Sequence, residues 1–318
     1  MNTMRAIRQT AFGDSSVLEL VEVPVPEPLP TEVRVRVHAA GVNPVDGKTR
    51  AGQGMAAIQG EPPFGVGWDV SGVVDAVGFG VTTLAPGDEV YGMPWFPREA
   101  GAYAEYATAP SRQFARKPRS IGHVEAAALP LAALTAWQAL VDTAHVEAGQ
   151  RVLIHAAAGG VGHLAVQIAA SRGAHVIGTG SAAREEFVRS LGAAQFIDYR
   201  STRFEEQLEP VDVVIDLIGE AEQTGLRSVS IVRPGGLYVG VPSGISAEVA
   251  AAAEARGVRT TGFLVEPDGA ALTQIAELVD TGALRVAVER TFPLAQAAAA
   301  QDAVATGRTQ GKIVIEVV

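Results

Sequence analysis

The chain has 318 residues, 47% of them hydrophobic, which is enough for two domains with buried cores. Its net charge of -10 argues against a nucleic-acid partner, because such a partner requires a basic patch. The lack of cysteine excludes disulfides and thiolate metal sites, and the sequence shows neither a signal peptide nor an apolar run long enough to span a bilayer. We therefore expect a cytoplasmic protein without membrane contact.

The first third of the chain is rich in Val, Pro and Gly, with apolar and polar residues alternating. Residues 33–37 and 70–75 follow this period of two, and the turn signal Pro86-Gly87-Asp88 lies beyond them. Alternation of this kind is typical of short strands with one buried face. The sequence therefore predicts a small β barrel here.

From residue 125 onward, Ala-rich helical stretches alternate with short apolar strands, which is the pattern of a parallel α/β sheet. The expected strands are 151–156, 175–180, 195–199, 211–218, 236–241 and 259–265, followed by a helix over 271–279. A strand over 285–292, an Ala-rich helix and a strand over 312–317 complete the chain. We expect an α/β protein with a barrel domain over 1–124 and 285–318 and a doubly wound Rossmann domain over 125–284.

A glycine-rich turn lies between the strand at 151–155 and a helical segment that begins near Leu164. Gly159 would let the backbone approach a pyrophosphate, and Gly162 would allow close packing of helix on strand. The G-x-G-x-x-G fingerprint begins here with alanine, so the segment alone also fits an ordinary tight turn. Its place between strand and helix favours a dinucleotide site formed by Ala157, Gly159, Gly160, Val161 and Gly162.

The end of the next strand indicates which dinucleotide is bound. The strand ends in Gly180-Ser181, without the carboxylate that accepts hydrogen bonds from the ribose of NAD. Ser181 and Arg184 would bind the extra phosphate of NADPH, and Tyr199 would cover it. Alternatively, Arg184 is an ordinary surface cation and Tyr199 a packing residue. We favour the phosphate roles and therefore NADPH.

Several segments along the chain resemble one known group of proteins. The likeness is carried by 39–46 with its Val-Asn-Pro, 86–92, 128–137 with its Leu-Thr-Ala, 156–162, and 311–315 with its Gly-Lys. Together they resemble the zinc-free quinone oxidoreductase branch of the medium-chain dehydrogenase/reductase superfamily, over essentially the whole chain.

The resemblance implies a GroES-like barrel built from both chain ends, an inserted Rossmann domain, and an active-site cleft at their junction. It places Asn43 and Thr135 beside the nicotinamide as catalytic residues. It also implies a homodimer, with the sheet edge at 259–265 as the expected contact. The cofactor groove is expected to be completed by Gly240, Val241, Pro242, Phe263, Leu264, Val265, Gly311 and Lys312.

No metal is expected. Zinc-dependent relatives carry a Cys and a Gly-His-Glu segment in the barrel, and the corresponding positions here hold Asn43 and Gly67-Trp68-Asp69. A catalytic zinc needs about three protein ligands. The histidines are scattered along the sequence without ligand spacing, at His38, His123, His145, His155, His163 and His175.

Without a metal, the acceptor must stabilise the negative charge that hydride brings, which favours small quinones and related conjugated carbonyls. We expect Trp95 and the loop 47–63 to form the acceptor pocket with Asp46, although Asp46 and Lys48 also fit a solvated loop pair. Tyr103 and Tyr106 are expected to pack in the barrel. No general acid is evident.

Two other functions fit the same sequence. One is an enone or enoyl-thioester reductase of a biosynthetic pathway, and the other is a non-catalytic NADPH-binding interaction protein. Thioester-reducing relatives carry a tyrosine in the loop after the Asn-Pro segment, whereas residues 48–55 contain none. This difference weighs against a thioester substrate.

Overall fold

The computed structural model describes residues 2–219, 223–242 and 244–318, and their packing divides the chain into two compact units. The first unit consists of Met1–Leu134 and Glu266–Val318, and the second of Thr135–Val265. This division assigns 125–134 and 266–284 to the first unit, whereas the sequence-based prediction placed both segments in the Rossmann domain. The reason is that helix α3 (His123–Ala127) packs on the barrel strands β3 and β5, and α10 (Gly269–Asp280) packs on β8.

The first unit is built around a seven-stranded sheet in the order β15-β16-β3-β5-β6-β8, with β7 paired to β3, and a three-stranded sheet in the order β2-β1-β4. Its strands are β1 (Thr3–Gln9), β2 (Leu18–Pro24), β3 (Glu32–Val42), β4 (Phe64–Gly65), β5 (Val70–Val77), β6 (Glu89–Gly92), β7 (Tyr106–Pro110), β8 (Phe114–Arg116), β15 (Val288–Pro293) and β16 (Lys312–Glu316). Its remaining helices are α1 (Pro44–Arg50), α2 (Ala56–Gln59) and α11 (Ala297–Ala305).

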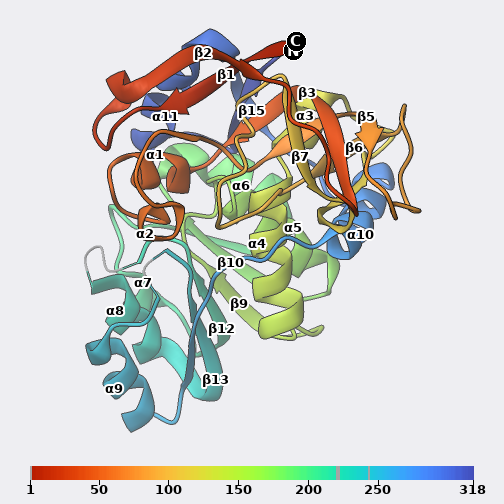
Figure 1. The fold of residues 1–318 in the computed structure, drawn as a ribbon. Coiled ribbons are helices and arrows are strands. Elements are labelled where there is room, and N and C mark those ends of the chain that lie inside the picture. The colour runs from red at the N-terminus through yellow and green to blue at the C-terminus, as the bar shows by residue number, and fades with distance from the viewer. Residues whose placement is uncertain (1, 220–222, 243) are drawn as a thin grey trace. The chain divides into compact units, whose positions relative to one another are not determined.

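Both ends of the chain contribute to this unit, as the sequence predicts. Strand β16 pairs antiparallel with β3, and α11 packs on α1, so the blue C-terminal elements of Figure 1 lie against red and orange N-terminal ones. The alternating residues Val33, Val35 and Val37 of β3 are fully buried in the apolar core. The period-two pattern therefore marks the core face of this strand.

The second unit contains a parallel six-stranded sheet in the order β11-β10-β9-β12-β13-β14. This order is that of a doubly wound Rossmann sheet, with its switch point between β9 and β12. The strands are β9 (Arg151–Ile154), β10 (His175–Gly180), β11 (Gln195–Asp198), β12 (Val211–Asp216), β13 (Val232–Gly240) and β14 (Arg259–Gly262). The helices are α5 (Gly162–Ser171), α6 (Glu185–Ser190), α7 (Phe204–Gln207), α8 (Thr224–Ile231) and α9 (Ala247–Ala255).

One helix crosses the boundary between the units. Helix α4 (Pro130–Trp137) contains Leu134 and Thr135, the residues at which the chain divides, and it continues into a π-helical segment, η3 (Gln138–Thr143). This segment was not predicted from the sequence, because a π-helix has no distinct pattern of apolar residues.

Candidate active site

The strand register of the first unit places Asn43 beside Lys312. Asn43 follows β3 directly, and Lys312 begins β16. The antiparallel pairing joins Val42 to Ile313, so the residues that flank this pair meet across the sheet. Gly311 has a φ of 71°, and a side chain there would lie 2.2 Å from the carbonyl oxygen of Ala287. Glycine is therefore required where the chain turns into β16.

Asn43, Asp69 and Lys312 form a closed cluster inside the barrel unit. The Asn43 amide nitrogen donates to Asp69 Oδ2 at 2.8 Å, and the Lys312 ammonium donates to Asn43 Oδ1. Lys312 Nζ also lies 3.5 Å from Asp69 Oδ2 and 3.0 Å from the carbonyl oxygen of Val42, to which it donates. All three polar side chains are buried, with exposed fractions of 0% to 3%.

The hydrogen-bond pattern indicates that this cluster is charged. Lys312 Nζ has three oxygen neighbours, one for each ammonium hydrogen, and Asp69 accepts N–H groups on both carboxylate oxygens, from Asn43 and from Leu131 at 2.7 Å. Burial raises the pKa of Asp69 and lowers the pKa of Lys312. The Asp69 carboxylate and the Lys312 ammonium therefore each stabilise the charged form of the other.

A second buried carboxylate lies next to this cluster. Asp46 Oδ2 accepts the backbone N–H of Asn43 and the hydroxyl of Tyr103, both at 2.7 Å, and Asp46 Oδ1 has no partner among the described residues. Burial raises the pKa of Asp46 to about 7. Asp46 is 2% exposed whereas Lys48 is exposed, so the alternative of a solvated pair is wrong.

The segment around Trp95 contributes to the barrel core. Met93 and Phe96 are buried, and the Trp95 indole donates to the carbonyl oxygen of Thr108 at 2.8 Å. Trp95 itself is half-buried and packs on the core. Its contribution to an acceptor pocket stays a prediction.

Thr135, the other predicted catalytic residue, lies in α4 and is 3% exposed. Asp69 accepts the backbone N–H of Leu131, in the first turn of the same helix. Leu131 and Thr135 are four residues apart, so they lie on one face of the helix. The carboxylate that holds Asn43 therefore also holds the start of α4.

In the second unit, the glycine-rich turn joins β9 to α5. A side chain at Gly162 would lie 2.2 Å from the carbonyl oxygen of Ala156 and 2.8 Å from the Cα of Ala157. Close packing between the first turn of α5 and the end of β9 therefore requires glycine at position 162. Ala157, Gly159, Gly160 and Val161 form the turn that precedes the helix.

The turn after β10 holds the predicted phosphate-binding residues. Ser181 precedes the short helix η4 (Ala182–Arg184), and the N–H of Tyr199 donates to the carbonyl oxygen of Gly180 at 3.2 Å. Tyr199 is 45% exposed, so the alternative of a packing residue does not hold. Asp198 uses its carboxylate in the following turn, where it accepts the N–H of Arg200 at 3.1 Å.

Arg200 was not among the residues predicted from the sequence. Its guanidinium lies 5.7 Å from the centre of the Tyr199 ring, which adds a second cation near the end of β10. No motif marks this residue, since its position follows only from the turn after β11.

The remaining predicted cofactor residues lie where β13 and β14 end. The N–H of Phe263 donates to the carbonyl oxygen of Gly240, and the N–H of Val241 donates to that of Asp216, at the end of β12. Leu264 is 52% exposed and Val265 is buried, while Pro242 follows Val241 at the same edge. The carboxyl ends of parallel strands share one edge of a sheet, so these residues lie on the edge that carries the β9–α5 turn.

This edge fits a dinucleotide. It combines a glycine turn before a helix of ten residues with a strand end that lacks a carboxylate, and these are the features that accept a pyrophosphate and an adenosine ribose phosphate. The turn residues predicted from the glycine pattern and the residues predicted at the ends of β13 and β14 lie on this edge, whereas Asn43, Gly311 and Lys312 belong to the barrel unit.

Two histidines that are distant in sequence lie together. The rings of His38 and His123 are 4.3 Å apart between centroids, and His123 Nδ1 lies 2.8 Å from Ser71 Oγ. The sequence spacing of the histidines gave no sign of this pair. Across the described ranges, no group of three or more His, Cys, Asp or Glu side chains is arranged to hold a metal ion.

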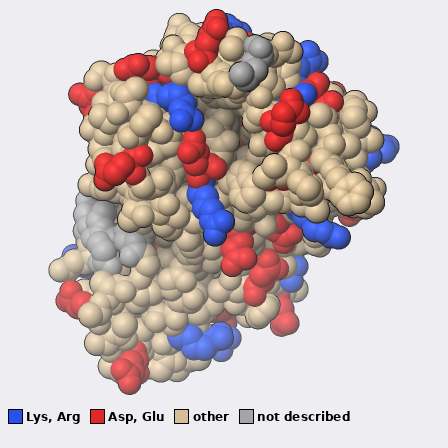
Figure 2. Space-filling model, in the orientation of Figure 1, with Lys and Arg blue, Asp and Glu red and all other residues tan. Residues whose placement is uncertain are grey.

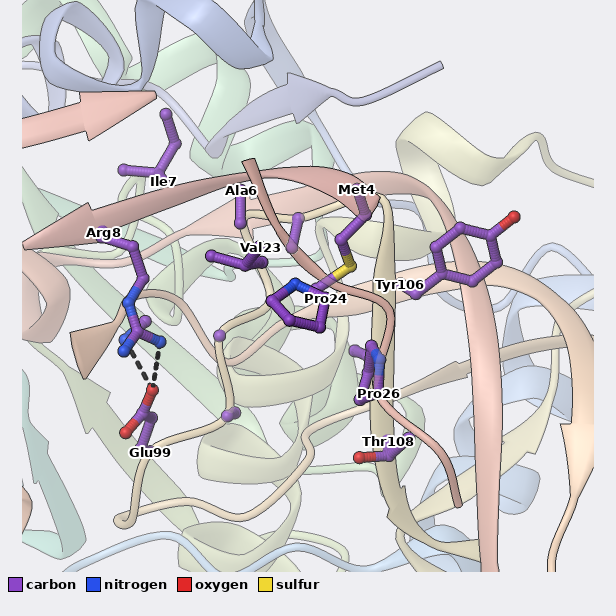
Figure 3. Close-up of a pocket in the computed structure, with 15 residues that line it drawn as sticks. Met4, Ala6, Ile7, Arg8, Val23, Pro24, Pro26, Glu99, Tyr106 and Thr108 are labelled. Carbon is purple, nitrogen blue, oxygen red and sulfur yellow. Dashed lines mark hydrogen bonds and ion pairs between the residues drawn. The ribbon is translucent and has the colours of Figure 1, made fainter. Parts of the chain in front are cut away.

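A pocket of about 380 Å³ opens beside β1 and β2, away from these candidate residues. Figure 3 shows Met4, Val23 and Pro24 lining it, with the ion pair of Arg8 and Glu99 at one end. Its lining includes neither Asn43, Asp46, Trp95 nor Lys312. No functional residue predicted from the sequence belongs to this pocket.

The surface charge is mixed. On the face drawn in Figure 2, the Lys and Arg side chains of the described residues are interspersed with Asp and Glu and form no continuous patch. This face therefore presents no extended cationic surface. In the part of the chain that the structure describes, no helix is both long and apolar enough to cross a membrane.

Fold and site together define a two-domain α/β oxidoreductase with a Rossmann sheet. Residues 29–119 match the family model of the alcohol dehydrogenase GroES-like domain, and residues 191–315 match that of zinc-binding dehydrogenases. The chain is 37% identical to the human mitochondrial NAD(P)H oxidoreductase RTN4IP1, over 89% of this chain and 81% of that protein. It is 33% identical to the tomato (Solanum lycopersicum) 2-methylene-furan-3-one reductase, over 98% and 79%.

A solved structure shares the fold over its full length. The quinone oxidoreductase from Coxiella burnetii superimposes with a TM-score of 0.94 at 38% identity, covering 100% of both chains. The chain therefore belongs to the medium-chain dehydrogenase/reductase superfamily, in its quinone oxidoreductase branch. As a member of that superfamily, it is an oxidoreductase that uses a nicotinamide cofactor.

Proposed function

We propose that this protein transfers hydride from NADPH to a small quinone or a related conjugated carbonyl compound, without zinc. The observation that carries the proposal is the buried cluster of Asn43, Asp69 and Lys312. By resemblance, Asn43 stands where zinc-dependent relatives have a Cys, and Asp69 ends the Gly67-Trp68-Asp69 segment that corresponds to their Gly-His-Glu. Here the two side chains bind each other and an ammonium group of the chain itself.

The acceptor class follows from this arrangement. A metal would polarise an isolated carbonyl, whereas hydrogen bonds alone are better matched to acceptors whose conjugation spreads the incoming charge. The bound cofactor supplies hydride from its nicotinamide, and the reduced acceptor then takes a proton while NADP⁺ remains. Asn43 and Thr135 would orient the reacting groups.

The preference for NADPH is supported by the end of β10. Ser181 and Arg184 offer a hydroxyl and a cation, and Tyr199 with Arg200 adds an exposed ring and a second cation. These groups suit a phosphate ester on the adenosine ribose.

Enones are the second acceptor class. The tomato relative is named for reduction of a 2-methylene-furan-3-one, which is an enone. Quinones and enones share a conjugated carbonyl, so one site accommodates both chemistries.

The test is pyridine-nucleotide oxidation, followed anaerobically with a chelator present. NADPH and NADH are compared against matched quinone, enone, enoyl-thioester and simple aldehyde acceptors. We expect chelator-resistant oxidation of NADPH with quinone or enone and little with aldehydes. Preference for enoyl thioesters would instead indicate a biosynthetic reductase, and tight NADPH binding without turnover would indicate a non-catalytic binding protein.

We further propose that the protein is a homodimer that pairs through β14. This strand lies at the edge of the parallel sheet, and Leu264 just beyond it is 52% exposed. Pairing with a second copy would satisfy the unpaired backbone groups of this edge strand and bury its apolar neighbour. Sedimentation should show a dimer, and a monomer at working concentration would reject this proposal.

A further inference from the structure

The side-chain amide of Asn43 has only one orientation that satisfies its neighbours. The Asp69 carboxylate can only accept hydrogen bonds, and the Lys312 ammonium can only donate them. The amide N–H must therefore point to Asp69 and the amide oxygen to Lys312, as observed. The second N–H of the amide has no acceptor among the described residues.

The two charged neighbours also polarise the amide. A cation at the amide oxygen draws electron density from the nitrogen, which makes the second N–H a stronger donor. The effect is large here because the three polar side chains are nearly inaccessible to solvent, and charges act more strongly in a low dielectric.

We propose that Lys312 and Asp69 are positioning residues that orient and polarise the Asn43 amide, whose second N–H donates to the acceptor oxygen during reduction. In this step the acceptor carbon gains hydride from NADPH, an electron pair moves onto the conjugated oxygen, and water later supplies the proton while NADP⁺ is left. The inference rests on the proposed function, in which Asn43 lies beside the acceptor.

This role differs from the one that the resemblance implies for Lys312. Its side chain is 3% exposed, and all of its described contacts are with oxygens of the barrel unit. In this proposal it acts through Asn43, and its contact with the cofactor stays a prediction.

The first test compares Lys312→Met, Asp69→Asn and the double variant with Lys117→Met. Lys117 is a matched control, because its side chain is also buried and its ammonium donates to the carbonyl oxygens of Pro118 and Ile121. The double variant removes both charges of the Lys312–Asp69 pair, so neither of these two groups is left buried without the other. We expect kcat to fall about tenfold in the three cluster variants, less than the roughly hundredfold cost of deleting an oxyanion donor.

The acceptor dependence separates this role from a structural one. A simple enone gives a more basic anion than a benzoquinone, so its reduction depends more on the Asn43 donor. The loss of kcat should be larger for the enone, while the Kd of NADPH stays unchanged. Equal losses for both acceptors would overturn the proposal.

A second readout needs no cofactor. In enzyme labelled with ¹⁵N-asparagine, the side-chain signals of Asn43 are identified by their loss in Asn43→Ala. They should shift in Lys312→Met and stay in place in Lys117→Met. Unchanged Asn43 signals in Lys312→Met would contradict the proposed polarisation.

The variants also distinguish this inference from the proposed function. If Asn43→Ala retains full activity, the catalytic role of Asn43 is wrong. If Asn43→Ala loses activity but Lys312→Met and Asp69→Asn do not, only the positioning role is wrong.

Discussion

The hydroxyl of Tyr103 donates a hydrogen bond of 2.7 Å to Oδ2 of Asp46, and both side chains are buried. The same oxygen accepts the backbone N–H of Asn43 at 2.7 Å. A tyrosine expected only to pack in the barrel thus holds the carboxylate that fixes the backbone at Asn43. The hydroxyl of Tyr103 therefore links a side chain of the barrel core to the position of Asn43 in the candidate site.

Tyr103→Phe should lower the free energy of unfolding by about 2 kcal/mol, because a buried hydrogen bond to a carboxylate is lost. The loss should be larger above pH 7 than below it, since burial raises the pKa of Asp46 to about 7 and the Tyr103 hydrogen bond acts to lower it. Urea unfolding of wild type and variant, once above and once below pH 7, measures the two losses. Tyr106→Phe, in a less buried tyrosine of the same barrel, is the control, and equal losses in both variants would contradict the role of Tyr103.

His155→Gln should reduce the loss of stability in acid. Burial lowers the pKa of His155 to about 4 from its usual 6.5, so the unfolded chain takes up a proton at higher pH than the folded one. Stability supplied by neutral His155 is therefore complete above about pH 6.5 and is lost as the pH falls towards 4, by about 3 kcal/mol in total.

The measurement is urea unfolding of wild type and variant across this window. The free-energy difference between them isolates His155, because His123, whose burial also lowers its pKa to about 4, titrates in both proteins. A parallel pH dependence of wild type and His155→Gln would refute this prediction.

Arg184→Gln should raise the KM for NADPH about tenfold and leave that for NADH unchanged. The expected loss is one charge-assisted hydrogen bond to the ribose phosphate. Initial-rate kinetics with both cofactors measure the change. Arg189→Gln is the matched control, because Arg189 pairs with Glu185 on the exposed surface of α6. An equal rise in the KM for NADPH in both variants would show that Arg184 does not bind the ribose phosphate.

Gly162→Ala should lower the free energy of unfolding by about 2 kcal/mol and weaken NADPH binding. Its methyl group would lie 2.2 Å from the carbonyl oxygen of Ala156, so α5 must move away from β9. Gly159→Ala meets the same oxygen at 3.2 Å and should cost less. Urea unfolding and a binding titration test both variants, and a larger stability loss for Gly159→Ala would show that α5 packs differently.

The sequence predicted the regular elements well because their patterns are local. The strand at 175–180 was predicted with the bounds of β10, and most other Rossmann strands were placed within a few residues of the observed bounds. The strand predicted at 236–241 begins earlier, at Val232, because an irregular pairing with β12 extends β13. Such an irregularity depends on the neighbouring strand and leaves no periodic signal.

The domain division was harder to predict. Helices α3 and α10 have the same Ala-rich texture as the Rossmann half, yet they pack on the strands of the barrel unit. Composition shows that a segment is helical but does not show which sheet it covers.

By itself, the sequence determined the class of fold, the glycine turn before α5 and the candidates Asn43, Asp46 and Lys312. It did so because glycine positions, hydrophobic periods and family motifs are local properties of the chain. Tertiary structure alone decided that Lys312 contacts Asn43 across 269 residues and that Asp69 joins them. Strand pairing and burial create these contacts, and burial also shifts the pKa values of Asp46, Asp69 and Lys312.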